Sequence, residues 1–231
     1  MKTIGLAGGT SWISSLDYYR LFNEITNQRL GGNEAAKIVL YSVNYGEIVT
    51  LTKKGDWDAI AAIMCEAAQK IEKAGADCVL LGANTMHHIA ERVQEAVQIP
   101  LLHIADATAI VIKKKGLKKV ALLGTRYTML FDFYKKKLEG HGIETIIPDD
   151  KGIEFVDDAI YNELGKGKFL SPTKQMFIDL INKLADEGAE GAILGCTEIP
   201  MLIKQEDTPV PVFDTTLIHA TAAVDFALGG L

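Results

Sequence analysis

The stretches "GADCVLLGANTMH" (residues 75–87) and "GAEGAILGCTEIP" (residues 188–200) are two versions of one pattern. Laid over each other, they match glycine with glycine at both ends of an apolar run, but Ala83 falls on Cys196. A short apolar run that ends in glycine and polar residues is typical of a buried parallel strand, and ligands bind beyond the carboxyl ends of such strands. The pair raises the question of why one copy has a thiol where the other has a methyl group.

The duplication extends beyond this pair. "TIGLAGGT" (3–10) resembles "KVALLGTR" (119–126), and "IPLLHIADATA" (99–109) resembles "VPVFDTTLIHA" (210–220). The offsets of the three matches, 116, 113 and 111, drift by only a few residues. Two copies are too few for a solenoid, so the pattern indicates two related halves.

Short apolar runs alternate with helical patterns in each half, which predicts parallel βα units. In residues 55–75, apolar side chains recur at helical spacing, Asp56 can cap the helix and Gly75 can end it. The counterpart over residues 173–190 predicts a buried face formed by Met176, Leu180 and Leu184.

We therefore predict an α/β fold with two pseudo-symmetric parallel-sheet domains and an active site in the cleft between them. The strand near Ile99 is expected to pass from one half to the other, and the strand near Val210 to pass back. This places the first domain at residues 1–98 plus 209–231 and the second at residues 99–208.

The composition bounds the function. The 231 residues are 48% hydrophobic and 23% charged, with a net charge of −6, which gives no support for nucleic acid or an anionic membrane as a partner. No apolar run approaches a membrane span and the start does not read as a signal peptide, so we expect a cytoplasmic protein. Three cysteines do not make a disulfide framework, and no spacing suggests a metal site.

Cys196 is the candidate catalytic group. It follows a buried strand and precedes Thr197 and Glu198, where unpaired backbone N–H groups and a helix dipole would favour the thiolate. A modest lowering of the thiol pKa would make it a usable base near neutrality. The alternative is a small buried hydrophobic residue, which is how we interpret Cys65 and Cys78.

The turns after the other strands supply candidate binding groups. Asn84 and Thr85 are good helix N-caps, and they can also grip a carboxylate together with nearby N–H groups. Small residues in the turns at 8–11 and 124–126 let backbone N–H groups approach an anion, but neither turn matches a nucleotide-binding motif.

Six stretches carry a family resemblance: "IGLAGGTSW" at 4–12, "YYRLFNE" at 18–24, "ANTMH" at 83–87, "HIADAT" at 103–108, "ALLGTRYTM" at 121–129 and "GCTEI" at 195–199. The chain resembles the aspartate/glutamate racemase family, in particular the bacterial amino-acid racemases that need no pyridoxal phosphate. The resemblance implies two thiols that exchange protons at opposite faces of an amino-acid α-carbon, without a cofactor or metal. We also expect a homodimer.

Cys196 matches one of these thiols, and the other position is occupied by Ala83. Alanine cannot exchange a proton, so the sequence predicts reduced or one-sided racemase activity. Ala83 marks a catalytic position that the chain lost, never had, or lost by engineering. Two alternatives stay open: a one-thiol decarboxylase or lyase similar to the arylmalonate decarboxylases, and an inactive form that only binds an amino acid.

The substrate expected from the resemblance is aspartate, glutamate or a related amino acid. Basic residues would hold its side-chain carboxylate, and Lys166 lies in a loop where the family can place such a lysine; Lys168 and Arg126 are further candidates. The predicted substrate-binding residues are Thr10, Ser11, Asn84, Thr85, Thr125, Lys166, Thr197 and Glu198.

Overall fold

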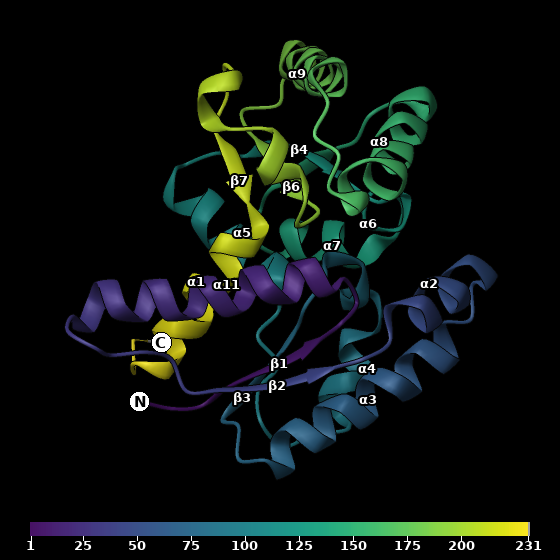
Figure 1. The fold of residues 1–231 in the computed structure, drawn as a ribbon. Helices are drawn as coiled ribbons and strands as arrows, with labels where there is room; N and C mark the ends of the chain where they lie inside the picture. The colour runs from purple at the N-terminus through teal and green to yellow at the C-terminus, as the bar shows by residue number, and fades with distance from the viewer. Residues whose placement is uncertain (231) are drawn as a thin grey trace. The chain divides into compact units, whose positions relative to one another are not determined.

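The computed structural model describes residues 1–230 and consists of two compact units. Unit 1 comprises residues 1–103 with 219–231, and unit 2 comprises residues 104–218. Within the described residues each unit has one parallel sheet, which confirms the predicted α/β fold with duplicated parallel-sheet halves (Figure 1).

The sheet of unit 1 has the strand order β2-β1-β3 and is parallel throughout. Its strands are β1 (Ile4–Gly8), β2 (Ile38–Ser42) and β3 (Cys78–Leu81). Its helices are α1 (Trp12–Leu30), α2 (Tyr45–Lys54), α3 (Trp57–Lys73), the 3-10 helix η1 (Asn84–Ile89), α4 (Ala90–Glu95) and most of α11 (Thr215–Ala227).

Both faces of this sheet are covered. Ile4 and Leu6 of β1 pack with α1 and α11, whereas the alternate residue Ala7 packs with α3. Figure 1 shows α1 and α3 on opposite sides of the strands. Asp56 caps α3 as predicted, since its carboxylate accepts a hydrogen bond from the Ala59 N–H at 3.0 Å.

The sheet of unit 2 has the order β5-β4-β6-β7 and is also parallel. Its strands are β4 (Lys119–Gly124), β5 (Glu144–Ile146), β6 (Ala192–Gly195) and β7 (Val212–Asp214). Its helices are α5 (Ile104–Lys114), α6 (Arg126–Leu130), α7 (Asp132–Gly140), α8 (Asp150–Asn162), α9 (Ser171–Asp186) and α10 (Ile199–Leu202), with 3-10 turns η2 (Leu164–Lys166) and η3 (Gln205–Asp207).

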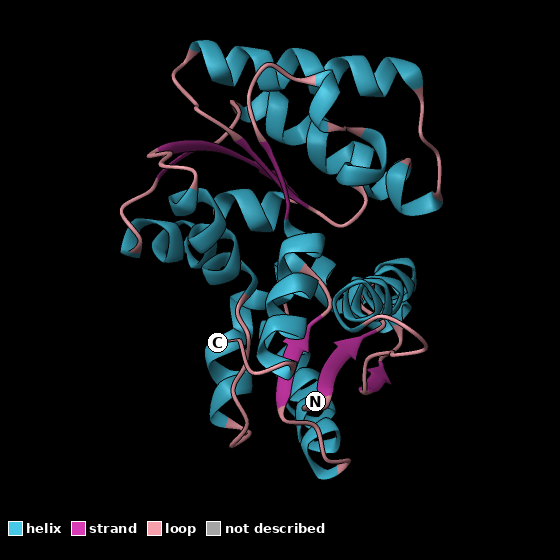
Figure 2. Ribbon diagram, turned by 90° about the vertical axis from the view of Figure 1, so that its left-hand side faces the viewer, coloured by secondary structure: helices cyan, strands magenta, loops and turns pink. Residues whose placement is uncertain are grey.

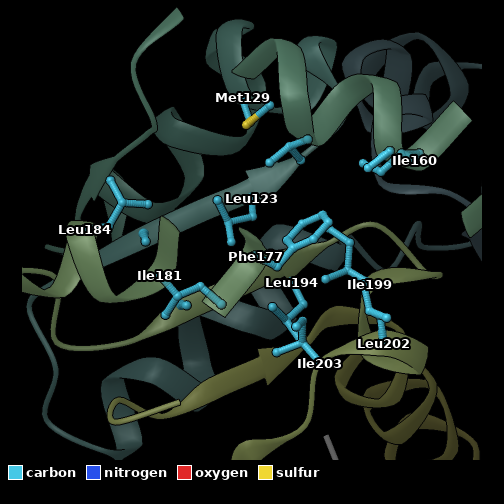
Figure 3. Packing of buried hydrophobic residues seen from close by; sticks show 14 of the residues in the cluster. Leu123, Met129, Ile160, Phe177, Ile181, Leu184, Leu194, Ile199, Leu202 and Ile203 are labelled. Atoms are coloured by element: carbon cyan, nitrogen blue, oxygen red, sulfur yellow. The ribbon is translucent and has the colours of Figure 1, made fainter. Parts of the chain in front are cut away.

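This second sheet also lies between two helical layers (Figure 2). Leu123 of β4 packs with α8 and α9, and Leu122 packs with α5 and α7. Figure 3 shows Leu123 and Leu194 of the sheet beside Phe177, Ile181 and Leu184 of α9.

The predicted inner face of α9 was wrong. Met176 is 51% exposed and Leu180 is only partly buried, whereas Phe177 and Ile181 are buried with Leu184. Both sets have helical spacing, so periodicity alone did not separate them. The set that includes the large aromatic ring of Phe177 faces the core, because that ring removes more apolar surface from water.

The duplication is visible in the hydrogen bonds of the sheets. The Val79 N–H donates to the Pro100 carbonyl at 3.0 Å, and the Ala192 N–H donates to the Pro211 carbonyl at 2.8 Å. These are matching residues of the two sequence repeats. Unit 2 forms the full strand β7 after Pro211, but unit 1 forms a single parallel bridge, Val79 with Leu101, after Pro100.

The helices that follow these segments are exchanged between the units. α5 begins at Ile104, directly after the bridge in unit 1, and packs in the core of unit 2. α11 begins at Thr215, directly after β7 of unit 2, and packs through Ala220, Ala223 and Val224 in the core of unit 1. Each core is therefore completed by a helix whose preceding strand belongs to the other unit.

Candidate active site

Two strand ends, one in each unit, share the same glycine arrangement. A Cβ on Gly82 would lie 3.3 Å from the Gly8 Cα, and a Cβ on Gly124 would lie 2.6 Å from the Gly195 carbonyl oxygen. Glycines at these positions let neighbouring strands and their following turns approach closely. Residue 83 and residue 196 each come directly after the second glycine of a pair, at the carboxyl edge of a parallel sheet.

The turn after β6 places two side chains on one carboxylate oxygen of Glu198. The Cys196 thiol donates to Glu198 Oε2 at 3.0 Å, and the Thr197 hydroxyl donates to the same oxygen at 2.6 Å. Glu198 and Thr197 are buried, and Cys196 is partly buried against the core of unit 2. The carboxylate therefore sets the position of the thiol.

The predicted lowering of the Cys196 pKa was wrong. Burial, followed by the charge of Glu198 and its hydrogen bond to the thiol, raises the pKa of Cys196 well above its ordinary value. The expected backbone N–H bonds from Glu198 and Thr197 are present and lower the pKa, but they are outweighed. The expected helix dipole is weak because α10 has only four residues, so few peptide dipoles align.

The corresponding turn in unit 1 is held through its backbone. Ala83 is extended, with φ −153° and ψ 145°, and it is the N-cap of η1 without any side-chain cap bond. Asn84 and Thr85 lie inside η1, so their predicted N-cap role was wrong; a cap residue must precede the first helical residue. The His87 ring nitrogen Nδ1 instead lies 3.1 Å from the Ala83 carbonyl oxygen.

The turn after β1 lies at the same edge of the sheet of unit 1. Ser11 caps α1, accepting from the Ser14 N–H at 3.4 Å, and the Ser14 hydroxyl donates to the Gly82 carbonyl at 2.8 Å. This bond ties the turn after β1 to the turn after β3. The Thr10 hydroxyl is buried and has no hydrogen-bond partner within residues 1–230, which is uncommon for a buried polar group.

Arg126 and Lys166, the predicted cationic groups of unit 2, have different partners. Thr125 caps α6, and Arg126 donates to Asp157 from its backbone N–H at 2.8 Å and its Nε at 2.7 Å. Lys166 is exposed in η2, and its Nζ donates to Asn162 Oδ1 at 3.3 Å. Lys166 is the more accessible charge, because Asp157 already neutralises Arg126.

Sequence reasoning missed two groups of residues. Asp157 anchors the turn after β4, and no sequence pattern distinguishes it from other helical acidic residues. The other group consists of packed rings: the buried Tyr18, His87 and His219 and the partly buried His103. The repeat could have indicated the contact between Tyr18 and His219. These two residues match Tyr134 and Thr108 in the other half.

Residues 1–230 contain neither a candidate metal site nor a candidate membrane span. No grouping of three or more His, Cys, Asp or Glu side chains could hold a metal ion. None of the helices combines the length and apolar character needed to cross a bilayer.

Two related parallel α/β units, each with a polar turn after the same strand, define a class of duplicated α/β proteins. The Asp/Glu/Hydantoin racemase family matches residues 8–223 of this chain. The chain belongs to that family, as its sequence motifs predicted.

Individual relatives agree with this assignment. The chain is 28% identical over 73% of its length to the broad specificity amino-acid racemase RacX of Bacillus subtilis, of which the match covers 73%. A Yersinia pestis structure classed as an Asp/Glu racemase is 48% identical, with a TM-score of 0.93 and coverage of 99% of this chain and 100% of that one. An aspartate racemase homologue from Pyrococcus horikoshii is 39% identical, with a TM-score of 0.87 over 99% of this chain and 100% of that one. These relatives support an amino-acid racemase, an isomerase, and do not favour the lyase or inactive alternatives.

Proposed function

We propose that this racemase-family protein acts on aspartate, glutamate or a closely related amino acid by proton transfer at Cα, with Cys196 as the reacting group. The observation that carries the proposal is the 3.0 Å contact between the Cys196 thiol and the Glu198 carboxylate. A thiol beside a buried proton acceptor is a common form of activated acid/base group.

The raised pKa of Cys196 determines the order of proton transfers. The resting thiol is protonated at neutral pH, so it first has to release its proton. Glu198 Oε2 takes that proton while the sulfur takes the α-proton of the substrate, which leaves a carbanion at Cα. The reverse sequence returns a proton to the same face, and no proton is gained or lost overall.

Position 83 limits what happens on the opposite face. The family resemblance implies a second acid there, and the methyl group of Ala83 cannot supply a proton. Inversion then depends on a water molecule, which is a poorly positioned acid compared with a fixed thiol. We expect Cα–H exchange to be faster than inversion.

Substrate binding is assigned to the groups around the two turns. The unpartnered Thr10 hydroxyl and the turns at Ser11, Asn84 and Thr85 are suited to an α-carboxylate. Thr125 and Thr197 would contribute from unit 2, together with Glu198. Lys166, exposed and without a carboxylate partner within residues 1–230, is the proposed partner of the substrate's side-chain carboxylate.

Deuterium wash-in at Cα from heavy water tests this proposal. Each enantiomer of aspartate and glutamate is incubated with the protein, and exchange and inversion are followed separately by NMR and chiral chromatography. We expect exchange that exceeds inversion and that is lost in Cys196→Ser, with Cys65→Ser as the matched control. Binding without exchange for all four substrates would overturn the proposal, and carbon dioxide release from a malonate would favour a lyase.

A further inference from the structure

A cluster of rings packs behind the turn at residue 83, and we call it the histidine cluster. It consists of the buried Tyr18, His87 and His219 and the partly buried His103. The His87 ring centroid is 4.6 Å from that of His103 and 5.5 Å from that of His219, both in edge-to-face geometry. Tyr18 and His219 are fully buried, and His87 is 2% exposed.

The hydrogen bonds of the cluster define its tautomers. A carbonyl oxygen can only accept, so His87 Nδ1 carries the hydrogen donated to the Ala83 carbonyl at 3.1 Å. For the same reason His219 Nε2 carries the hydrogen donated to the Leu102 carbonyl at 2.7 Å. His219 Nδ1 is then a lone pair, which accepts the Tyr18 hydroxyl hydrogen at 2.8 Å.

Burial keeps the imidazoles of His87 and His219 neutral. It lowers the pKa of His87 well below its ordinary value and lowers the pKa of His219 to about 3. A neutral His87 whose one N–H is donated to a carbonyl has no proton to give to a substrate. His87 is therefore not the missing second acid.

The contact of His87 instead fixes a peptide group. Ala83 is an N-cap without a side-chain cap bond, so the turn lacks the usual anchor at the start of a helix. The His87 N–H holds the Ala83 carbonyl, and hence the peptide plane between residues 83 and 84. The same ring packs against His103 and His219, which lie where the chain leaves unit 1 and where it returns.

We propose that His87 is a positioning residue for the turn at 83–85: its ring sets the direction of the side chain at position 83 and of the binding groups of Asn84 and Thr85. The importance of this turn for catalysis rests on the function proposed above, but its geometry does not. The repeat places Pro200, which has no donor, at the matching position in unit 2. The contact between an imidazole and the backbone carbonyl is therefore specific to the turn that lacks the thiol.

The test uses a thiol as a local probe, in the full-length Ala83→Cys protein. His87→Asn keeps an amide donor close to the position of Nδ1, whereas His87→Leu keeps the bulk without the donor. The rate of iodoacetamide labelling at residue 83 is followed by peptide mass spectrometry from pH 6 to 10. We expect the labelling rate of His87→Asn to stay within about threefold of the parent rate. We expect His87→Leu to change the rate at least about tenfold, because a thiol that has moved lies in a different environment.

The control is His88→Leu, because His88 is exposed and packs edge-on against Trp57 outside the cluster. Equal labelling profiles for the parent, His87→Asn and His87→Leu would overturn the proposal. If His87→Leu does not fold, a long-range NMR coupling between His87 Nδ1–H and the Ala83 carbonyl decides, and its absence in the unmodified protein overturns the proposal. Loss of substrate exchange in every variant would count against the proposed function alone, because labelling needs no turnover.

Discussion

The turns at residues 83 and 196 begin from the same backbone and end with different chemistry. Both follow a glycine at the carboxyl end of a strand that pairs with the first strand of its sheet in the chain, β3 with β1 and β6 with β4. In unit 2 a carboxylate, Glu198, holds the side chains of the turn; in unit 1 an imidazole, His87, holds its main chain. The duplication therefore preserves where the chain turns, while the residues directly after the turn determine which atoms are held and which can react.

The largest expected effect comes from making the two turns alike. Ala83→Cys adds one sulfur to a position that the repeat matches with Cys196, so overpacking should cost about 1 kcal/mol or less. A positioned acid or base contributes about 10²–10⁴-fold, and we expect inversion of aspartate or glutamate to rise by at least the lower figure. Chiral chromatography measures the rate, and Cys196→Ala in the same background should remove the gain. No gain in a folded protein that binds substrate would show that position 83 does not reach the α-carbon.

Acid should destabilise unit 1 more than unit 2. The unfolded imidazoles take up protons near pH 6.5, whereas folded His87 and His219 resist protonation to much lower pH, about 3 for His219. Protons therefore favour the unfolded state, and the free energy of unfolding decreases as pH falls below 6.5, by roughly 2 kcal/mol at pH 5 for His219, with His87 acting in the same direction.

Hydrogen exchange at pH 7 and pH 5 locates this loss of stability. We expect peptides of β1 and β3 to lose protection before those of β4 and β6. The reason is that His141 is the single histidine in the sequence of unit 2, whereas the buried imidazoles lie in unit 1. Equal loss of protection in both sheets would contradict the role given to the buried imidazoles.

Glu198→Gln should separate thiol reactivity from catalysis. The substitution removes the negative charge that raises the pKa of Cys196 but keeps an oxygen that can accept from the thiol. The fraction of thiolate at pH 7.5 should increase up to about tenfold for each unit by which the pKa falls, and iodoacetamide labelling should rise accordingly. Substrate exchange should fall, since an amide cannot take the thiol proton. Labelling of Cys65 in the same sample is the control. A rise in both Cys196 labelling and substrate exchange would contradict the proton-acceptor role of Glu198.

The smallest effect compares two buried tyrosines. Tyr18 donates to His219, and Tyr134 donates to Thr108 at 3.2 Å, in matching positions of the repeat. Thr108 also donates to the Ile104 carbonyl at 2.8 Å, so Tyr134→Phe leaves it bonded and should cost about 1 kcal/mol. Tyr18→Phe takes away the donor to a buried imidazole nitrogen and should cost about 1–3 kcal/mol. Urea unfolding measures both, and the reverse order would contradict the tautomer assigned to His219.

The sequence predicted the fold because its repeat marks strand ends directly. The glycine that ends each apolar run and the proline that opens the next one occupy matching places, and both prolines accept the same sheet hydrogen bond. The inner face of α9 was not predicted, because two sets of apolar residues fit one helical period.

The chemistry of the site was less accessible. The sequence identified Cys196 and its polar neighbours, but not that Glu198 would approach the sulfur and raise its pKa. Residue types do not reveal whether a nearby carboxylate is held against a thiol or turned away. The contact of His87 with Ala83 was not predicted, because it depends on a 3-10 turn where a capped helix was expected.

The exchange of α5 and α11 between the cores has a consequence for biosynthesis. Every residue of unit 2 leaves the ribosome before the part of α11 that completes unit 1, although residues 1–103 of unit 1 precede unit 2 in the chain. Until α11 is made, Ile4 and Leu6 can pack with α1 but lack Ala220, Ala223 and Val224, so the core of unit 1 stays incomplete. The second half of the duplication is thus the first that can finish folding, and it can do so while the first half is still incomplete.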